Sequence, residues 1–245
     1  MTGRLAAVIG SPIAHSLSPA IHRAAFEAAG IDWSYVAFEV APGEAVGALA
    51  AMRTLGIAGL SVTMPHKAAI AELVDRLDPA ARALHSVNTV SWDGDALVGS
   101  STDGAGFVAS LADAGIGVDG ARVAIIGAGG AGRGLVDALA RAGSTDITVL
   151  NRTPERAEQA ASLAAVASPG IISDISRADI VVNATSVGMG DDDGLPCDPE
   201  LLHAGQVAVD LIYHPLETRW LAAAAGRGCR TVDGLGMLVQ QAALQ

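Results

Sequence analysis

The chain has 245 residues, enough for one large domain or two modest ones, and 51% of them are hydrophobic against 17% charged, which excludes an intrinsically disordered protein. The net charge of -11 repels nucleic-acid phosphates and anionic lipids, and two cysteines are too few for a disulfide framework. The first apolar run, residues 5–9, is too short for a signal peptide. The sequence also lacks an apolar run long enough to predict a membrane span. We therefore expect a cytoplasmic protein that does not bind nucleic acid or a membrane surface. The expected state is a monomer or homodimer with a small-molecule partner.

Apolar segments of strand length alternate with helical segments along the chain. The expected strands cover residues 5–10, 34–40, 59–63, 87–91, 122–126, 146–150, 180–183 and 207–211. The expected helices cover residues 19–29, 44–52, 131–141, 154–165, 215–225 and 234–245. Ser18 before Pro19 and Thr153 before Pro154 are helix N-cap signals. The alternation predicts an α/β fold with parallel sheets covered on both faces, and a domain boundary near Asp103.

A glycine-rich turn separates the expected strand 122–126 from the expected helix 131–141. Gly127, Gly129 and Gly132 have the spacing G-x-G-x-x-G. The first glycine permits a tight turn, the second lets backbone N–H groups approach a pyrophosphate, and the third lets helix and strand pack closely. The helix N-terminus adds a partial positive charge toward the phosphates. A structural turn is the alternative, but the strand–helix context favours dinucleotide binding.

The end of the next strand indicates which dinucleotide binds. An NAD site usually has Asp or Glu there to bind the ribose 2′-hydroxyl, whereas this chain has Asn151, Arg152 and Thr153, followed by Arg156. Two arginines and a hydroxyl suit a 2′-phosphate. The alternative is an exposed arginine pair on a helix, but cations at a helix N-terminus oppose its dipole. The pattern therefore favours NADP.

Polar residues follow the expected strands of the first half, where α/β folds place ligand sites. Lys67 is the only lysine in the chain. Lysine differs from arginine because burial can lower its pKa until it exchanges protons near neutral pH, and a nearby carboxylate such as Asp103 would orient it. The alternatives are a solvated lysine and helix caps at Asp103 and Ser18. No metal-ligand spacing is present, so no metal is expected.

These motifs together resemble the shikimate dehydrogenase family, in family order over essentially the whole chain. The matching segments are residues 10–19, 21–22, 59–67, 87–89, 99–104, 127–132, 151–153, 183–189, 210–215 and 234–238. The resemblance implies reversible reduction of 3-dehydroshikimate to shikimate with NADPH, in aromatic amino acid biosynthesis. It also implies a substrate-binding and catalytic domain over 1–103, completed by a C-terminal helix over 233–245. The second domain, 104–232, would be an NADP-binding Rossmann domain with a doubly wound parallel sheet.

The family's functional residues can be carried over to matching positions. Lys67 and Asp103 would form the catalytic pair, because a developing alkoxide needs a proton and a nearby positive charge. The substrate carboxylate would be bound by Ser16, Ser18 and Tyr213, and the ring hydroxyls by Thr63, Asn88 and Gln241. The cofactor would be held by Gly127, Gly129, Gly130, Ala131, Asn151, Arg152, Thr153, Arg156, Thr185, Gly234 and Met237. In a helical C-terminus Met237 and Gln241 share a face, and spacing alone does not exclude Gln240.

Three departures from the family pattern bear on this assignment. The family usually has Asn at the positions of Ser61 and Ser101, and relatives usually continue for another helical stretch beyond Gln245. We expect Ser61 to loosen substrate selection and the closing helix to be short, with consequences for Gln241. Open alternatives are a quinate or aminoshikimate dehydrogenase and a non-catalytic protein that binds NADP or shikimate. A purely structural α/β protein leaves the motifs unexplained.

Overall fold

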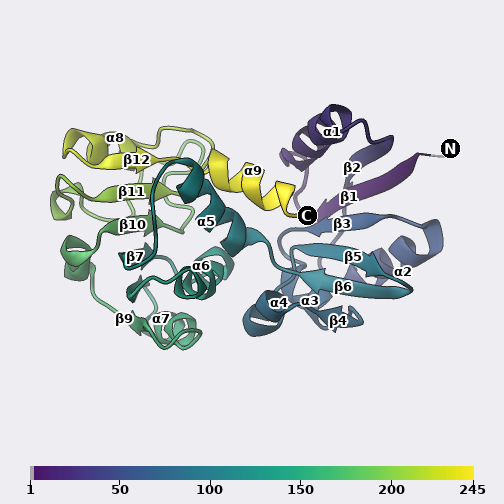
Figure 1. Cartoon of the computed structure of the whole chain (residues 1–245), viewed down its shortest axis with the longest axis horizontal. Helices are drawn as coiled ribbons and strands as arrows, with labels where there is room; N and C mark the ends of the chain where they lie inside the picture. Colours follow the sequence, from purple (N-terminus) through teal and green to yellow (C-terminus); the bar gives the residue numbers. More distant parts are fainter. Residues whose placement is uncertain (1–2) are drawn as a thin grey trace. The chain divides into compact units, whose positions relative to one another are not determined.

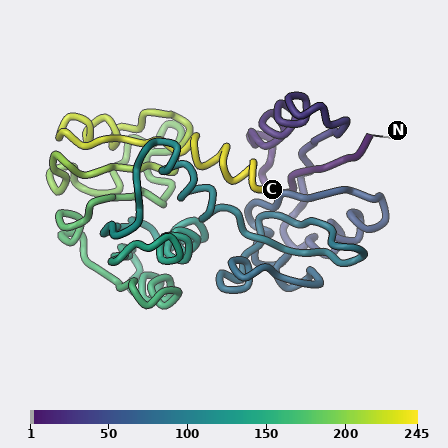
Figure 2. Tube along the Cα trace, viewed as in Figure 1, coloured from purple at the N-terminus to yellow at the C-terminus, as the bar shows by residue number. Residues whose placement is uncertain are grey.

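A computed structural model of the chain describes residues 3–245, which form two compact units (Figure 1). The first unit contains the chain as far as Thr102 together with the last residues, Ala242–Gln245. The second unit contains Asp103–Gln241. Most of the C-terminal helix α9 (Leu235–Ala243) therefore belongs to the second unit, and its end returns to the first (Figure 2).

The first unit contains a six-stranded sheet in the order β2-β1-β3-β5-β6-β4. Its strands are β1 (Arg4–Gly10), β2 (Trp33–Glu39), β3 (Gly59–Val62), β4 (Arg76–Leu77), β5 (Thr89–Asp93) and β6 (Ala96–Ser100). Strands β2, β1 and β3 are parallel, as the alternation predicts, but β5 runs antiparallel to β3 and β6. The unexpected strand β6 accounts for the second of these pairs, because Gly94 with φ +61° lies in a tight hairpin between β5 and β6.

Helices cover the two faces of this sheet unequally. On one face, α2 (Ala45–Leu55), α3 (Lys67–Ala71) and α4 (Pro79–Leu84) enclose a core that includes Ile9, Val62 and Val90. On the other face, α1 (Ser18–Ala28) covers a smaller core around Val8 and Tyr35. The N-cap prediction for Ser18 is wrong, because Leu17 occupies the cap position and Ser18 is the first helical residue.

The second unit is an all-parallel sheet in the order β12-β11-β10-β7-β8-β9. Its strands are β7 (Arg122–Ile126), β8 (Asp146–Leu150), β9 (Ala167–Pro169), β10 (Ile180–Asn183), β11 (Val207–Asp210) and β12 (Arg230–Val232). The chain extends from β7 to one side through β8 and β9, and then to the other through β10 to β12. This order confirms the predicted Rossmann architecture, and ligands of such folds bind where the strand order reverses.

Alternating residues of β7 supply the two cores of the second unit. Val123 and Ile125 pack with α5 (Asp103–Asp113), α6 (Gly130–Arg141) and α7 (Pro154–Ala161), whereas Ala124 and Ile126 pack with η1 (Ile172–Arg177) and α8 (Arg219–Gly226). A short η2 (Pro199–Leu201) precedes β11. Helix α8 begins four residues later than expected because the Thr218 hydroxyl caps it, accepting from Leu221 N at 3.2 Å. Within residues 3–245, none of the helices is both long and apolar enough to cross a bilayer.

Candidate active site

The loops that follow β1 and β3 lie side by side at the carboxyl ends of these parallel strands. Thr63 N donates to Ile9 O at 2.9 Å, and Ser11 N donates to Met64 O at 3.0 Å. Gly10 is required here, because a Cβ at this position would overlap the Thr63 methyl group. The loop after β1 then folds tightly, with Ser18 N donating to Ser16 Oγ at 3.3 Å. The predicted substrate residues Ser16, Ser18 and Thr63 therefore share one edge of the sheet.

Lys67 and Asn88 are anchored to the same edge. Lys67 is the first residue of α3, and its carbonyl accepts from Val87 N at 3.0 Å. Asn88 is only 2% exposed, and its carbonyl accepts from Val62 N at 2.7 Å. The Asn88 amide donates to Thr102 Oγ1 at 2.9 Å and accepts from Thr102 N at 3.0 Å. Asn88 thus fixes the chain one residue before Asp103, which begins α5 in the second unit.

The glycine turn has a separate structural reason for each of its three glycines. Gly127 has φ +112°, a conformation that favours glycine, and its N–H donates to Leu150 O at 2.7 Å. A Cβ on Gly132 would overlap Gly127 O, so helix α6 and the turn are in direct backbone contact. Gly129 is exposed, and a Cβ there would meet nothing within 4 Å. This open space at the N-terminus of α6, where Gly130 and Ala131 form the first turn, leaves room for a dinucleotide pyrophosphate.

These contacts make different predictions for two alanine substitutions in the turn. Gly132→Ala should lower the free energy of unfolding by about 1–3 kcal/mol, because the methyl group overpacks the helix–turn contact. Gly129→Ala should change stability by less than about 1 kcal/mol but weaken NADP binding about tenfold, because the methyl group occupies the open space. Urea denaturation and a fluorescence titration with NADPH measure the two effects. Unaltered NADPH affinity in folded Gly129→Ala would contradict a pyrophosphate site at this turn.

Asn151 connects the glycine turn to the predicted 2′-phosphate site. Its Oδ1 accepts from Ala128 N at 3.2 Å, and its Nδ2 donates to Thr153 O at 2.9 Å. Thr153 is the N-cap residue of α7, as predicted, but its side chain makes no capping hydrogen bond within the described chain. Arg152 and Arg156 are exposed and form no salt bridge with any residue of 3–245. Two unpaired cations at this position suit an anionic ligand group.

The remaining predicted cofactor residues of the second unit lie on loops after β10 and β11. Thr185 follows β10, and its hydroxyl donates to Asn183 Oδ1 at 2.7 Å. Gly234 N donates to Ile212 O at 2.9 Å, and a Cβ on Gly234 would overlap Leu211 O, so Gly234 lies against the loop that carries Tyr213.

Helix α9 begins just after Gly234 and carries the last predicted ligands. Met237 packs on the core that α5 and α6 share. Gln240 donates to Asp113, while the Gln241 amide donates to Leu238 O at 2.9 Å. A Cβ on Gly106 would lie 2.6 Å from Gln241 N, so α5 and α9 are closely packed at Gln241. Gln240 is therefore engaged with α5, and the role of Gln241 as a ligand stays a prediction.

Two buried polar residues of the second unit carry no predicted role. Asn183 and Asp210 are the last residues of β10 and β11, are both 0% exposed, and are partners in the parallel register. Asn183 Nδ2 donates to Asp210 Oδ1 at 3.0 Å. The signal in the sequence is a polar residue that ends an apolar strand, but only the sheet order shows that the two are neighbours.

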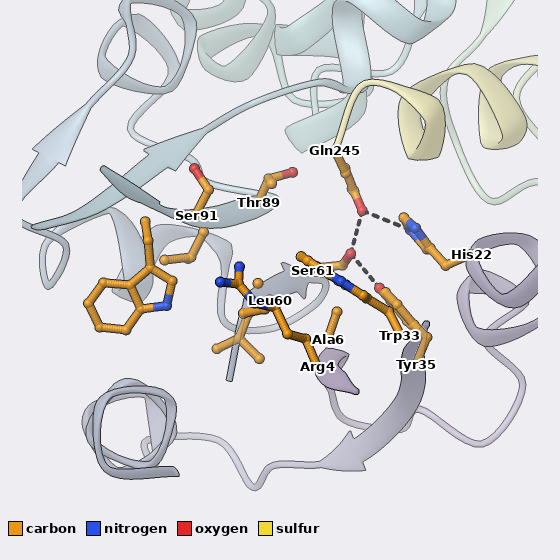
Figure 3. Close-up of a pocket in the computed structure, with 14 residues that line it drawn as sticks. Arg4, Ala6, His22, Trp33, Tyr35, Leu60, Ser61, Thr89, Ser91 and Gln245 are labelled. Carbon is orange, nitrogen blue, oxygen red and sulfur yellow. Dashed lines mark hydrogen bonds between the residues drawn. The ribbon is translucent and has the colours of Figure 1, made fainter. Parts of the chain in front are cut away.

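A pocket of about 310 Å³ lies on the face of the first sheet that α1 covers only in part (Figure 3). Tyr35 donates to Ser61 Oγ at 2.5 Å, and Ser61 donates to Gln245 Oε1, which also lies 3.2 Å from His22 Nε2. Of the described residues that line the pocket, none is a predicted substrate ligand. The Ser61 side chain thus takes part in a network with the C-terminal residue, and its predicted effect on substrate selection stays a prediction.

Tyr35 should make the stability of the protein fall at alkaline pH. Burial raises its pKa from 10.0 to about 12, although the hydrogen bond to Ser61 opposes this shift. A pKa raised in the folded state contributes stability that is complete below pH 10 and is lost between pH 10 and 12, at most about 2–3 kcal/mol. Urea denaturation at pH 8 and pH 11 should therefore show a larger loss for the wild type than for Tyr35→Phe. Equal losses in the two proteins would contradict this assignment.

Among residues 3–245, no three His, Cys, Asp or Glu side chains are grouped so that they could hold a metal ion. The candidate site offers lysine, hydroxyl, amide and glycine-turn groups.

Comparison with known proteins identifies the family. A family model described as "Shikimate dehydrogenase substrate binding domain" matches residues 8–90, and one described as "Shikimate / quinate 5-dehydrogenase" matches residues 110–188. The shikimate dehydrogenase (NADP(+)) of Moorella thermoacetica is 45% identical to this chain over an alignment of 251 residues. The alignment covers 98% of this chain and 85% of that protein.

Solved structures agree with the sequence matches. Shikimate 5-dehydrogenase of Thermus thermophilus, in complex with NADP(H) and shikimate, is 38% identical with a TM-score of 0.92, covering 98% of this chain and 91% of that one. Ligand-free 5-ketofructose reductase of a Gluconobacter strain is 34% identical with a TM-score of 0.93, covering 100% and 91%. Since a relative at 45% identity spans nearly the whole chain, and both units match models of one family, this protein belongs to the shikimate dehydrogenase family.

Proposed function

We propose that this protein is an NADP-dependent shikimate dehydrogenase, which reversibly reduces 3-dehydroshikimate to shikimate in aromatic amino acid biosynthesis. The observation that carries the proposal is the 45% identity, over 98% of the chain, to a shikimate dehydrogenase (NADP(+)). Arg152 and Arg156 are exposed and have no ion pair within the described part of the chain, which supports NADP as the cofactor. A cytoplasmic location and a monomeric or dimeric state remain predictions of the sequence.

The proposed roles follow the two units. The first unit carries most of the proposed substrate ligands, and the second holds NADP(H), which when bound supplies or accepts the hydride. Lys67 donates a proton to the oxygen of the ketone as the alcohol forms, and its positive charge stabilises the developing alkoxide. Asp103 orients the lysine ammonium. In the oxidation direction Lys67 is the proton acceptor, by microscopic reversibility.

The substrate's polar groups would be bound by hydroxyls and amides. We assign the carboxylate to Ser16 and Ser18 with the Tyr213 hydroxyl, and the ring hydroxyls to Thr63, Asn88 and Gln241. The shared edge of the first sheet supports this assignment for Ser16, Ser18 and Thr63. The hydrogen bonds of Asn88 to Thr102 support a second role, in which Asn88 fixes the segment that leads to Asp103.

The most direct test measures initial rates of shikimate oxidation with NADP⁺ and NAD⁺ in parallel. Shikimate with NADP⁺ should give the highest kcat/KM. Quinate at equal concentration, and 5-ketofructose with NADPH, test the activities named for the second family model and for one structural relative. A higher kcat/KM with quinate or 5-ketofructose would replace the proposed substrate, and a preference for NAD⁺ would overturn the role of Arg152 and Arg156. The absence of any turnover, with NADPH still bound, would indicate a non-catalytic binding protein.

A further inference from the structure

Two loops of the second unit are tied together by a buried polar network that begins at Asn183 and Asp210. The first loop, residues 184–190, carries Thr185, and the second, residues 211–218, carries Tyr213. Asn183 and Asp210 end neighbouring parallel strands, so their side chains meet directly beneath the starts of both loops. The two residues are 0% exposed, which makes every hydrogen bond between them and the loops a contact shielded from water.

The Asn183 side chain forms hydrogen bonds with the first loop. Its Oδ1 accepts from Thr185 N at 3.0 Å and from the Thr185 hydroxyl at 2.7 Å. Its Nδ2 donates to Val187 O at 3.1 Å, and Val187 N in turn donates to Thr185 Oγ1 at 3.1 Å. The Thr185 hydroxyl is thereby held in one orientation, since it donates to Asn183 and accepts from Val187 N.

The Asp210 carboxylate accepts hydrogen bonds from both ends of the second loop. Its Oδ1 accepts from Ile212 N at 3.1 Å as well as from Asn183, and its Oδ2 accepts from the Thr218 hydroxyl at 2.8 Å. Ile212 is the residue before Tyr213, and Thr218 is the cap of α8. A carboxylate is the group that can accept from all three donors at once, and a buried carboxylate is retained at an energetic cost. Burial raises the pKa of Asp210, in keeping with that cost.

We propose that Asp210 is a positioning residue that, through Asn183, holds the two loops in one fixed arrangement, so that Thr185 on the cofactor side and Tyr213 on the substrate side are placed together. The backbone bond from Gly190 N to His214 O, at 2.9 Å, joins the same two loops farther out and fits this role. The expected kinetic effects of this proposal rest on the function proposed above. The coupling of the two loops does not, because it is a property of the free protein.

The first test is amide hydrogen exchange in the free protein. Asp210→Ala should raise exchange rates about tenfold or more in both loops, 184–190 and 211–218. Asp192→Ala is the matched control, because its carboxylate accepts from Gly188 N and Gly194 N and has no hydrogen bond to the second loop among the described residues. It should affect the first loop only. Exchange unchanged in either loop of Asp210→Ala would overturn the coupling.

The second test separates positioning from general stability through kinetics. Asp210→Ala should raise KM for both shikimate and NADP⁺ about tenfold, while Asp210→Asn, which keeps one acceptor oxygen and the side-chain shape, should raise both KM values less than Asp210→Ala does. In a Tyr213→Phe background, Asp210→Ala should raise KM for shikimate much less than in the wild type, because the two residues act as one unit. Fully multiplicative effects would overturn the proposal.

If Asp210→Ala does not fold, Thr218→Val tests the same arrangement from the far end of the second loop. It removes only the donor to Asp210 Oδ2 and the cap of α8. Amide exchange should then rise in residues 211–218 but not in 184–190. The KM for shikimate should also rise, while the KM for NADP⁺ should stay unchanged. Unchanged exchange in 211–218 would contradict the proposal. A wild type that turns over no shikimate would refute the proposed function alone, since the exchange experiments would still decide the coupling.

Discussion

Lys67→Ala is expected to lower kcat for shikimate oxidation by about 10²- to 10⁴-fold, the range that a general acid–base group contributes. Lys67 is the only lysine in the chain, so no second ammonium can replace it. Its backbone carbonyl, which accepts from Val87 N at 3.0 Å, is unaffected by the substitution. The fold at the edge of the sheet should therefore persist. Stopped-flow or steady-state NADPH absorbance measures the rate, and a fluorescence titration shows whether NADPH binding persists.

Lys67→Arg distinguishes the role of the positive charge at this position from the role of proton transfer. Arginine keeps the positive charge but does not release a proton near neutral pH, so kcat should stay low even where substrate KM recovers. A matched control is Arg82→Ala, at an exposed position on α4 of the same unit, which should leave kcat unchanged. Near wild-type turnover of Lys67→Ala would show that Lys67 is not the proton donor.

The double substitution Arg152→Ala with Arg156→Ala is expected to raise KM for NADP⁺ about 10- to 100-fold with little change for NAD⁺. Hydrogen bonds to a charged group contribute about 1.5–3 kcal/mol, and 1.4 kcal/mol corresponds to a factor of ten. Only NADP⁺ has the 2′-phosphate, so the selectivity and not the turnover should change. Parallel steady-state kinetics with the two cofactors measures it.

Arg177→Ala provides the control for a general loss of positive charge. Arg177 is on the same unit, and its ion pair among the described residues is with Asp174 at 2.6 Å on the surface, which contributes little to stability. It should leave KM for both cofactors unchanged. An equal rise in KM for NADP⁺ in this control would indicate a long-range charge effect instead of a 2′-phosphate site.

Local sequence patterns located most of the regular elements. Apolar runs such as Arg122–Ile126 and Asp146–Leu150 are strands with the expected bounds, because alternate residues are buried on opposite faces. The glycine turn was also predictable, since its spacing reflects backbone requirements that other residues meet poorly. Strand β6 was not among the expected elements, and helix α5 was foreseen only through the alternative of a helix cap at Asp103. β6 depends on pairing with β5, and α5 packs closely on α6, where a Cβ on Gly104 would lie 2.6 Å from the Ala138 Cβ.

Caps show the limit of local signals. Ser18 and Thr153 have the same hydroxyl-before-proline pattern, yet Leu17 is the cap of α1 and the Thr153 side chain caps nothing among the described residues. Ser18 N is instead engaged by Ser16 Oγ, within the loop that the neighbouring strand β3 helps to fix. The choice among competing hydrogen-bond partners depends on which groups the fold brings within reach.

The amino-acid order alone determined the family, the two α/β halves and the cofactor class. The signals for them are repeated burial patterns, turn glycines and the arginines after β8, and each can be recognised within a few consecutive residues. Tertiary structure alone decided that Asn88 holds Thr102, that Ser61 binds the C-terminal Gln245, and that Asn183 and Asp210 are neighbours. Each of these contacts joins residues that are distant in sequence. Their partners are set by strand order and register, which depend on how the whole sheet buries its two faces.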